Sequence, residues 1–135
     1  MDTKTPRVLL VEDSTFMQDM YSLKFKKAGF DFHGLTNIDD EFPKKVIEIN
    51  PDLILMDIHF EGSENNGVGA AENLRLDEKT KMIPIIFFTN ADIEELAQRA
   101  QKLGSSIGFL VKSAYTPSEV VLKVRELYDK FSKQK

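Results

Sequence analysis

The residues with the clearest potential for chemistry in this 135-residue sequence come directly after short apolar runs. They are Glu12, Asp13, Asp57, Thr89 and Lys112. A carboxylate can act as a nucleophile toward a phosphoryl group, and carboxylate oxygens are ligands that Mg²⁺ prefers. A lysine and a hydroxyl can bind phosphoryl oxygens, because phosphoryl transfer depends mainly on positioning and charge. If the fold gathers these side chains, they predict magnesium-dependent transfer of a phosphoryl group to Asp57.

Each of these residues, taken alone, has an ordinary structural interpretation. Asp13 or Ser14 could cap the first predicted helix, and Thr89 or Asn90 could cap the fourth. Asp57 could be a turn residue and Lys112 a solvated charge. What favours a functional site is therefore the joint occurrence of these residue types at the ends of apolar runs, and the elements around them decide whether they meet.

The sequence alternates short apolar runs with longer amphipathic ones, which predicts alternating strands and helices. The predicted strands are residues 7–11, 30–35, 53–56, 85–88 and 107–111. The predicted helices are residues 14–28, 39–50, 67–77, 91–103 and 117–131. Pro43 should either open or kink the second helix, since proline lacks the N–H that a helix interior needs. Strict alternation favours an α/β fold in which helices cover both faces of a parallel sheet.

The carboxyl ends of parallel strands meet at one edge of the sheet, where open α/β proteins bind their ligands. Glu12 and Asp13 follow the first predicted strand, Asp57 the third, Thr89 the fourth and Lys112 the fifth. Carboxylates crowded at this edge would repel one another and raise a pKa. A divalent cation such as Mg²⁺ would relieve that repulsion.

Composition limits the classes of function. The chain has 18 Lys and Arg against 22 Asp and Glu, a formal net charge of -4, and no Cys. The absence of Cys excludes disulfides, thiolate zinc sites and a Cys nucleophile. The acidic balance argues against nucleic-acid binding. No apolar run is long enough to span a membrane or to act as a secretory signal, so we expect one soluble domain in the cytoplasm.

Four segments together resemble the receiver domain of two-component response regulators, of the stand-alone, CheY-like kind. They are VLLVEDS (8–14), PDLILMDI (51–58), FFTNA (87–91) and GFLVKS (108–113). The resemblance covers essentially the whole chain and implies a single receiver domain over residues 1–135, with a core at about 7–131. It also implies a flavodoxin-like (βα)5 three-layer sandwich with the strand order 2-1-3-4-5 known for that family.

The resemblance assigns a role to each residue at the sheet edge. Asp57 would be the phosphoacceptor. The ligands of Mg²⁺ (or Mn²⁺) would be Glu12, Asp13, Asp57 and the main-chain carbonyl of His59. Thr89, as the switch hydroxyl, and Lys112 would bind the phosphoryl oxygens, and Phe109 would be the switch aromatic.

The function that the resemblance implies is that of a signalling phosphoacceptor, not an enzyme, which takes part in its own phosphorylation and dephosphorylation. The donor would be a phosphohistidine on a sensor histidine kinase or a phosphotransfer protein. Phosphorylation would change the face made by the fourth helix, fifth strand and fifth helix. Since no output domain is visible, we expect a separate downstream effector protein, with no nucleic-acid or membrane partner.

Two other functions remain open at this stage. A pseudo-receiver would keep the fold and act as a phosphate-independent interaction module. A metal-dependent phosphatase on a similar sheet would need a second acid/base carboxylate two residues after its nucleophile, where this chain has His59. Retention of the five site residues argues against the first, and His59 argues against the second.

The chain departs from the family pattern around the site. The loop after Asp57 is longer than usual, and its segment 61–66 is either an ordinary solvated loop or a partial lid. Ser113 stands where the family usually has Pro, which leaves the isomer of the Lys112–Ser113 peptide bond open. His59 and Ala91 flank the site, where side chains can block or assist the water that hydrolyses an acyl phosphate.

Overall fold

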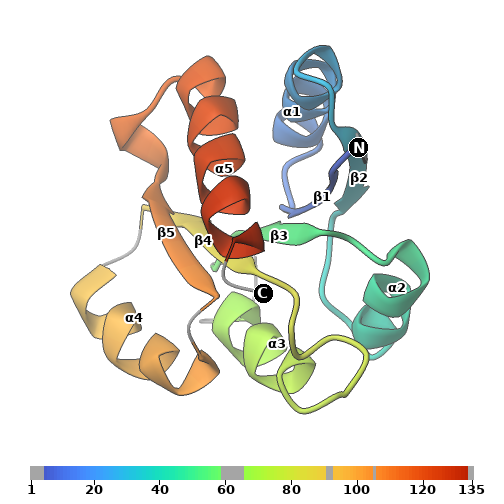
Figure 1. Cartoon of the computed structure of the whole chain (residues 1–135), viewed down its shortest axis with the longest axis vertical. Helices are drawn as coiled ribbons and strands as arrows, with labels where there is room; N and C mark the ends of the chain where they lie inside the picture. Colours follow the sequence, from blue (N-terminus) through green and yellow to red (C-terminus); the bar gives the residue numbers. More distant parts are fainter. Residues whose placement is uncertain (1–4, 59–65, 91–92, 105, 134–135) are drawn as a thin grey trace.

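The computed structural model describes residues 5–58, 66–90, 93–104 and 106–133, without the side chains of residue 66 and residues 93–96. At its centre lies a parallel sheet of five strands in the order β2-β1-β3-β4-β5 (Figure 1). The strands are β1 (Arg7–Val11), β2 (Asp31–Leu35), β3 (Leu53–Met56), β4 (Ile85–Thr89) and β5 (Ile107–Val111). The predicted fold class and strand order are therefore confirmed.

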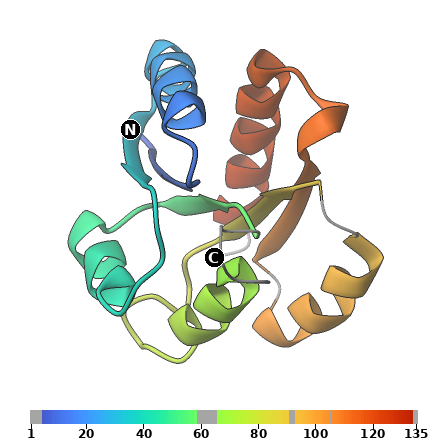
Figure 2. The ribbon, with the colours of Figure 1, turned by 180° about the vertical axis from the view of Figure 1, so that it is seen from behind.

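Helices cover both faces of this sheet, which makes three layers (Figures 1 and 2). The helices are α1 (Thr15–Lys27), α2 (Phe42–Ile49), α3 (Asn66–Leu74), α4 (Ile93–Ala100) and α5 (Pro117–Ser132). Short 3-10 turns follow α4 and β5, namely η1 (Gln101–Leu103) and η2 (Lys112–Ala114). Helices α1 and α5 lie side by side on one face, and α2, α3 and α4 lie on the other. None of the helices in the described part of the chain is long and apolar enough to cross a membrane.

Local sequence signals mark the starts of α1, α2 and α5. The Ser14 hydroxyl accepts a hydrogen bond of 3.2 Å from the Met17 amide at the start of α1, so Ser14 is the N-cap. Pro43 lies in the first turn of α2 and opens that helix, because its missing N–H has no partner there in any case. Thr116 and Glu119 form a reciprocal capping box at the start of α5.

Helix α3 ends at Leu74, three residues before its predicted end at Asp77. The Thr80 hydroxyl donates to the Leu74 carbonyl at 2.6 Å, which caps the helix from a residue further along the chain. The neighbouring Arg75 turns inward. Its guanidinium donates to the main-chain carbonyls of Leu103 at 2.7 Å, Ile83 at 2.9 Å and Ser106 at 3.4 Å.

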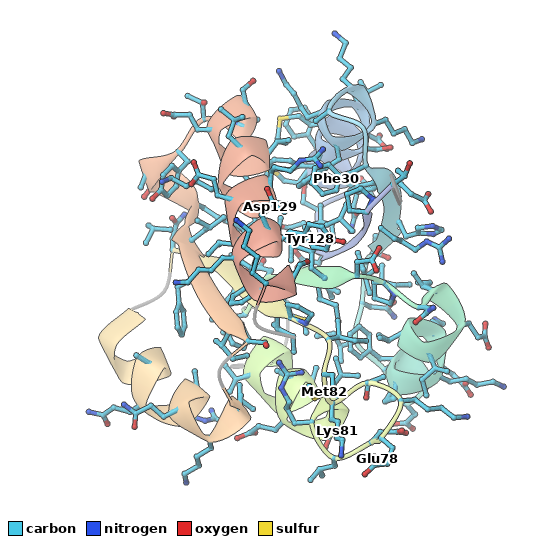
Figure 3. All side chains as sticks on the ribbon, viewed as in Figure 1. Phe30, Glu78, Lys81, Met82, Tyr128 and Asp129 are labelled. Carbon is cyan, nitrogen blue, oxygen red and sulfur yellow. The ribbon has the colours of Figure 1, made fainter. Side chains whose placement is uncertain are left out.

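The inner strands β1, β3 and β4 are buried on both faces, so successive residues feed two separate apolar layers. In β1, Leu9 packs toward α2, α3 and α4, whereas Leu10 packs toward α1 and α5. Figure 3 shows side chains filling both spaces between sheet and helices. Phe30 belongs to the α1–α5 layer, and the Arg125 guanidinium lies 4.5 Å from the centre of its ring. This double core fixes the carboxyl ends of the strands relative to one another.

Candidate functional site

The strand register brings the predicted site residues to one edge of the sheet. Val11 pairs with Met56, Met56 pairs with Phe87, and Thr89 pairs with Val111. Glu12, Asp57 and Lys112 each come one residue after the end of a strand, and Thr89 is the last residue of β4. The main chain continues this alignment for one more bond, because the Asp57 amide donates to the Val11 carbonyl at 2.9 Å.

Lys112 joins two buried carboxylates at this edge. Its Nζ atom lies 2.7 Å from Oε1 of Glu12 and 3.1 Å from Oδ2 of Asp57. Glu12 is 2% exposed and Asp57 is 5% exposed. The other Asp57 oxygen, Oδ1, accepts a hydrogen bond of 2.8 Å from the Ile58 amide. Both oxygens of Asp57 are thus oriented, one by the main chain and one by an ammonium group.

The three acids form a group that could hold a cation. Ligand oxygens of Glu12, Asp13 and Asp57 all lie within 4.8 Å of one another. Asp13 is exposed to solvent, whereas the other two acids are buried. A set of hard carboxylate oxygens with one open side suits Mg²⁺, which keeps several waters and binds few protein ligands. The residues present therefore fit the predicted ion.

Burial and charge act in opposite directions on these groups. Burial raises the pKa of Glu12, and the hydrogen bond from Lys112 acts against this. Burial would lower the pKa of Lys112, but its hydrogen bond to Glu12 and the charges of Asp57 and Glu12 together raise it. The ammonium group therefore stays charged beside the acids. Burial, with a smaller contribution from the charge of Glu12, also raises the pKa of nearby Tyr21 to about 12.

Thr89 and Phe109 lie where the prediction put them, on the last two strands. Thr89 is 1% exposed. Phe109 is half-buried, and its ring lies 5.7 Å from that of Phe87, the residue with which it pairs across β4 and β5. The structure thus shows a buried threonine and a partly accessible aromatic ring on neighbouring strands.

Several predictions fall outside the described residues. The His59 carbonyl, Ala91 and the segment 59–65, which holds most of the long loop after Asp57, are among them. The isomer of the Lys112–Ser113 bond, in contrast, is settled as trans, because no peptide bond between described residues is cis. Asn90, which follows Thr89, accepts a hydrogen bond of 2.8 Å from the Ser113 amide through Oδ1.

Gln18 supports the main chain at Glu12, and the sequence did not predict this role. From α1, its buried Nε2 atom lies 3.1 Å from the Leu10 carbonyl and 3.0 Å from those of Glu12 and Leu35. Gly34 makes room for this amide, since a Cβ at position 34 would overlap it. A polar residue on the inner face of a predicted helix was the available signal.

Gly67 is a second residue that the sequence reading missed. It lies at the start of α3, and its amide donates to the Ile58 carbonyl at 3.2 Å. A Cβ at position 67 would overlap the Asp57 carbonyl oxygen. The absence of a side chain at position 67 therefore lets α3 pack directly against the main chain of Asp57.

Comparison with known proteins decides the family. Residues 8–125 match the family described as the response regulator receiver domain. The chain belongs to this family. Receiver domains are phosphoacceptors in signalling and interact with histidine kinases and effectors. The match therefore confirms the predicted family.

Among curated proteins, this receiver domain is 34% identical over 116 residues to chemotaxis protein CheY of Thermotoga maritima, covering 85% of this chain and 91% of CheY. It is 24% identical over 123 residues to the DNA-binding dual master transcriptional regulator RpaA of Synechocystis, covering 90% of this chain and 48% of RpaA. The receiver domain therefore spans nearly all of CheY and about half the length of RpaA.

Solved structures show the same fold. Chemotaxis protein CheY4 of Vibrio cholerae has a TM-score of 0.78 at 22% identity, covering 92% of this chain and 99% of CheY4. A CheY-like receiver domain protein of Methanospirillum hungatei has a TM-score of 0.80 at 20% identity, covering 98% and 100% of the two chains. At these identities the likeness concerns the fold alone. The comparisons do not support the pseudo-receiver alternative.

Proposed function

We propose that this receiver domain accepts a phosphoryl group on Asp57 from a phosphohistidine of a sensor histidine kinase or phosphotransfer protein. The observation that carries the proposal is the bridge that Lys112 makes between Glu12 and Asp57 at the edge where Asp13 also lies. This arrangement combines a nucleophile, an acidic cation site and a positive charge.

In the transfer, a carboxylate oxygen of Asp57 attacks the phosphorus atom. A P–O bond forms to Asp57, the P–N bond to the donor histidine breaks, and its electron pair leaves with the ring nitrogen. The hydrogen bond from the Ile58 amide to Oδ1 holds the carboxylate in a fixed orientation for this attack.

Glu12, Asp13 and Asp57 would hold Mg²⁺ or Mn²⁺, and this cation would neutralise charge on the incoming phosphoryl group. Lys112 would transfer its hydrogen bonds from the carboxylates to phosphoryl oxygens. Its ammonium group can do so without leaving the site, because it already lies 3.1 Å from Asp57. By the resemblance, the His59 carbonyl would complete the ligand set.

The signal would leave through β4 and β5. The Thr89 hydroxyl would move to a phosphoryl oxygen, Phe109 would turn into the space behind it, and the face formed by α4, β5 and α5 would change shape for a separate effector protein. The packing of Phe109 on Phe87 supports this proposal, since a half-buried ring can become more buried.

The decisive experiment compares intact mass after incubation with acetyl phosphate and Mg²⁺. We expect the parent to gain one phosphate, whereas Asp57→Asn should gain none, because an amide cannot form the acyl phosphate. Omission of Mg²⁺ should slow the gain strongly. A parent that gains no phosphate with Mg²⁺ or Mn²⁺ would overturn the proposal and favour a phosphate-independent interaction module.

A further inference from the structure

The loops that follow β4 and β5 are joined by one hydrogen bond beyond the end of the sheet. Thr89 and Val111 are the last paired residues of these strands. Beyond them, Oδ1 of Asn90 accepts a hydrogen bond from the Ser113 amide at 2.8 Å. A side chain thus extends the ladder between β4 and β5 after the main-chain pairing has ended.

This bond lies next to both groups that would contact the phosphoryl oxygens. Asn90 directly follows Thr89, and Ser113 directly follows Lys112. The distance between the main chains of Thr89 and Lys112 therefore depends on β4–β5 pairing on one side and on the Asn90–Ser113 bond on the other. Without the bond, the η2 turn that begins at Lys112 loses one link to the loop after β4.

Lys112 is otherwise held mainly at its far end. Its Nζ atom contacts Glu12 and Asp57, and lies 5.5 Å from the centre of the Phe88 ring. When the ammonium group leaves the carboxylates for phosphoryl oxygens, those contacts no longer fix the lysine. The main chain then has to hold it, and the bond to Ser113 contributes to this together with the β4–β5 pairing and the η2 turn.

We propose that Asn90 is a positioning residue that acts through the Ser113 amide to hold Lys112 for phosphoryl transfer to Asp57. The inference rests on the proposed function. It also gives a chemical consequence to Ser113, because a proline at this position would have no N–H to donate.

The test measures the rate at which Asp57 gains phosphate from acetyl phosphate at saturating Mg²⁺. Asn90→Ala removes the acceptor and Ser113→Pro removes the donor. Each should slow the reaction by about threefold to tenfold, the range expected for one hydrogen bond of ordinary net strength. Ser113→Ala keeps the amide, Asn73→Ala removes an exposed asparagine on α3, and both should react at the parent rate.

Combined variants show whether the effect passes through Lys112. Asn90→Ala/Ser113→Pro should be no slower than the slower single variant, since both changes break the same bond. In a Lys112→Ala background, Asn90→Ala should have no further effect. A merely structural role of Asn90 would slow the reaction in that background too, and this result would overturn the inference.

A second readout observes the bond itself. The Ser113 amide should exchange slowly with solvent in the parent and in Ser113→Ala, and quickly in Asn90→Ala. A rapidly exchanging Ser113 amide in the parent, or variants that react at the parent rate, would overturn the positioning role while leaving the phosphoacceptor function intact. A parent that gains no phosphate would overturn both.

Discussion

Lys112 compensates two buried acids before any ligand arrives. Glu12 and Asp57 would repel each other if both were charged and lacked a cation between them. The ammonium group lies within hydrogen-bond distance of both and is itself half-buried. The residue that would bind the phosphoryl group therefore also makes the acidic site compatible with a folded domain.

We expect Gln18 to hold the main chain of Glu12 in place for cation binding, and a substitution at position 18 tests this. Gln18→Met keeps a similar volume but removes the N–H donors that bind the carbonyls of Leu10, Glu12 and Leu35. We expect a loss of about 1–2 kcal/mol in the free energy of unfolding. We also expect Mg²⁺ binding to weaken several-fold by titration calorimetry, because the main chain of Glu12 loses a hydrogen bond.

Gln98→Met is the matched control for Gln18→Met, because Gln98 lies exposed on α4. Gln98→Met should change neither the free energy of unfolding nor the affinity for Mg²⁺. If Gln18→Met loses stability but binds Mg²⁺ with the affinity of the parent, Gln18 only supports the fold and does not position the acids.

A pH-dependent contribution to stability comes from the other end of the sheet. The hydrogen bond from Arg7, at 2.7 Å, together with the nearby His33, lowers the pKa of Asp31 below its usual 3.8, although slight burial opposes this. A lowered folded-state pKa stabilises the protein above the unfolded value, and this stability is lost as the pH falls through the folded value.

Asp31→Asn should therefore reduce the free energy of unfolding near pH 7, by no more than about 0.5 kcal/mol because the pair is partly exposed and screened. The difference from the parent should shrink below pH 3.8 and should also shrink with added salt at pH 7. Urea titrations across this pH range measure it. A difference that is constant with pH would contradict the assignment to the ion pair.

At the scale of elements, β4 and β5 would carry the proposed response to phosphorylation. The chain has no Trp, so a single Trp placed at Phe109 would report on this pair of strands alone. We expect the fluorescence of Phe109→Trp to shift to shorter wavelength when acetyl phosphate and Mg²⁺ are added, because the ring becomes more buried. The shift should disappear when Thr89→Ala is added to Phe109→Trp. A shift of equal size in the double variant would mean that burial of the ring at position 109 does not depend on the Thr89 hydroxyl.

The elements themselves were largely predictable from the sequence, and so was the gathering of the site. Strands β1, β3 and β5 begin and end at the predicted residues. For β1 and β3 the reason is that strands buried on both faces need nearly continuous apolar residues. The residues after the strand ends then had to meet at one edge. Helix limits were less predictable, since the end of α3 depends on a hydroxyl from Thr80, which lies beyond the helix.

The supporting contacts of the site could not be predicted for the same reason. Gln18, Gly34 and Gly67 act through carbonyls and close approaches that exist only after α1, β2 and α3 have packed. The Asn90–Ser113 bond joins residues 23 positions apart in sequence and leaves no periodic pattern. Residue type alone cannot distinguish such contacts from solvated loop positions.

At the scale of the whole molecule, ion binding at one edge should stabilise the entire domain. Anything that binds only the folded state raises its stability by mass action, by about 1.4 kcal/mol at tenfold the Kd. For a domain of this length that is about 4–6 °C in Tm. We expect Mg²⁺ to raise the Tm by this amount and a chelator to reverse the rise. Differential scanning calorimetry measures both changes.

Asp13→Asn is the matched variant for this measurement, because Asp13 is the exposed acid of the group. It should lose most of the rise in Tm while retaining the melting temperature of the metal-free parent to within a few degrees. An equal rise in Asp13→Asn would mean that Mg²⁺ acts elsewhere on the protein.

The inward-facing Arg75 has a consequence for how a change at the carboxyl edge can spread. Its guanidinium ties the end of α3 to the segment before β4, the end of η1 and the turn before β5. These carbonyls lie at the amino ends of β4 and β5, away from Asp57. If the carboxyl ends of β4 and β5 move when Thr89 moves, their amino ends would stay fixed and act as the pivot. Hydrogen exchange of main-chain amides should then be slow at Leu103 and become faster toward the start of α4.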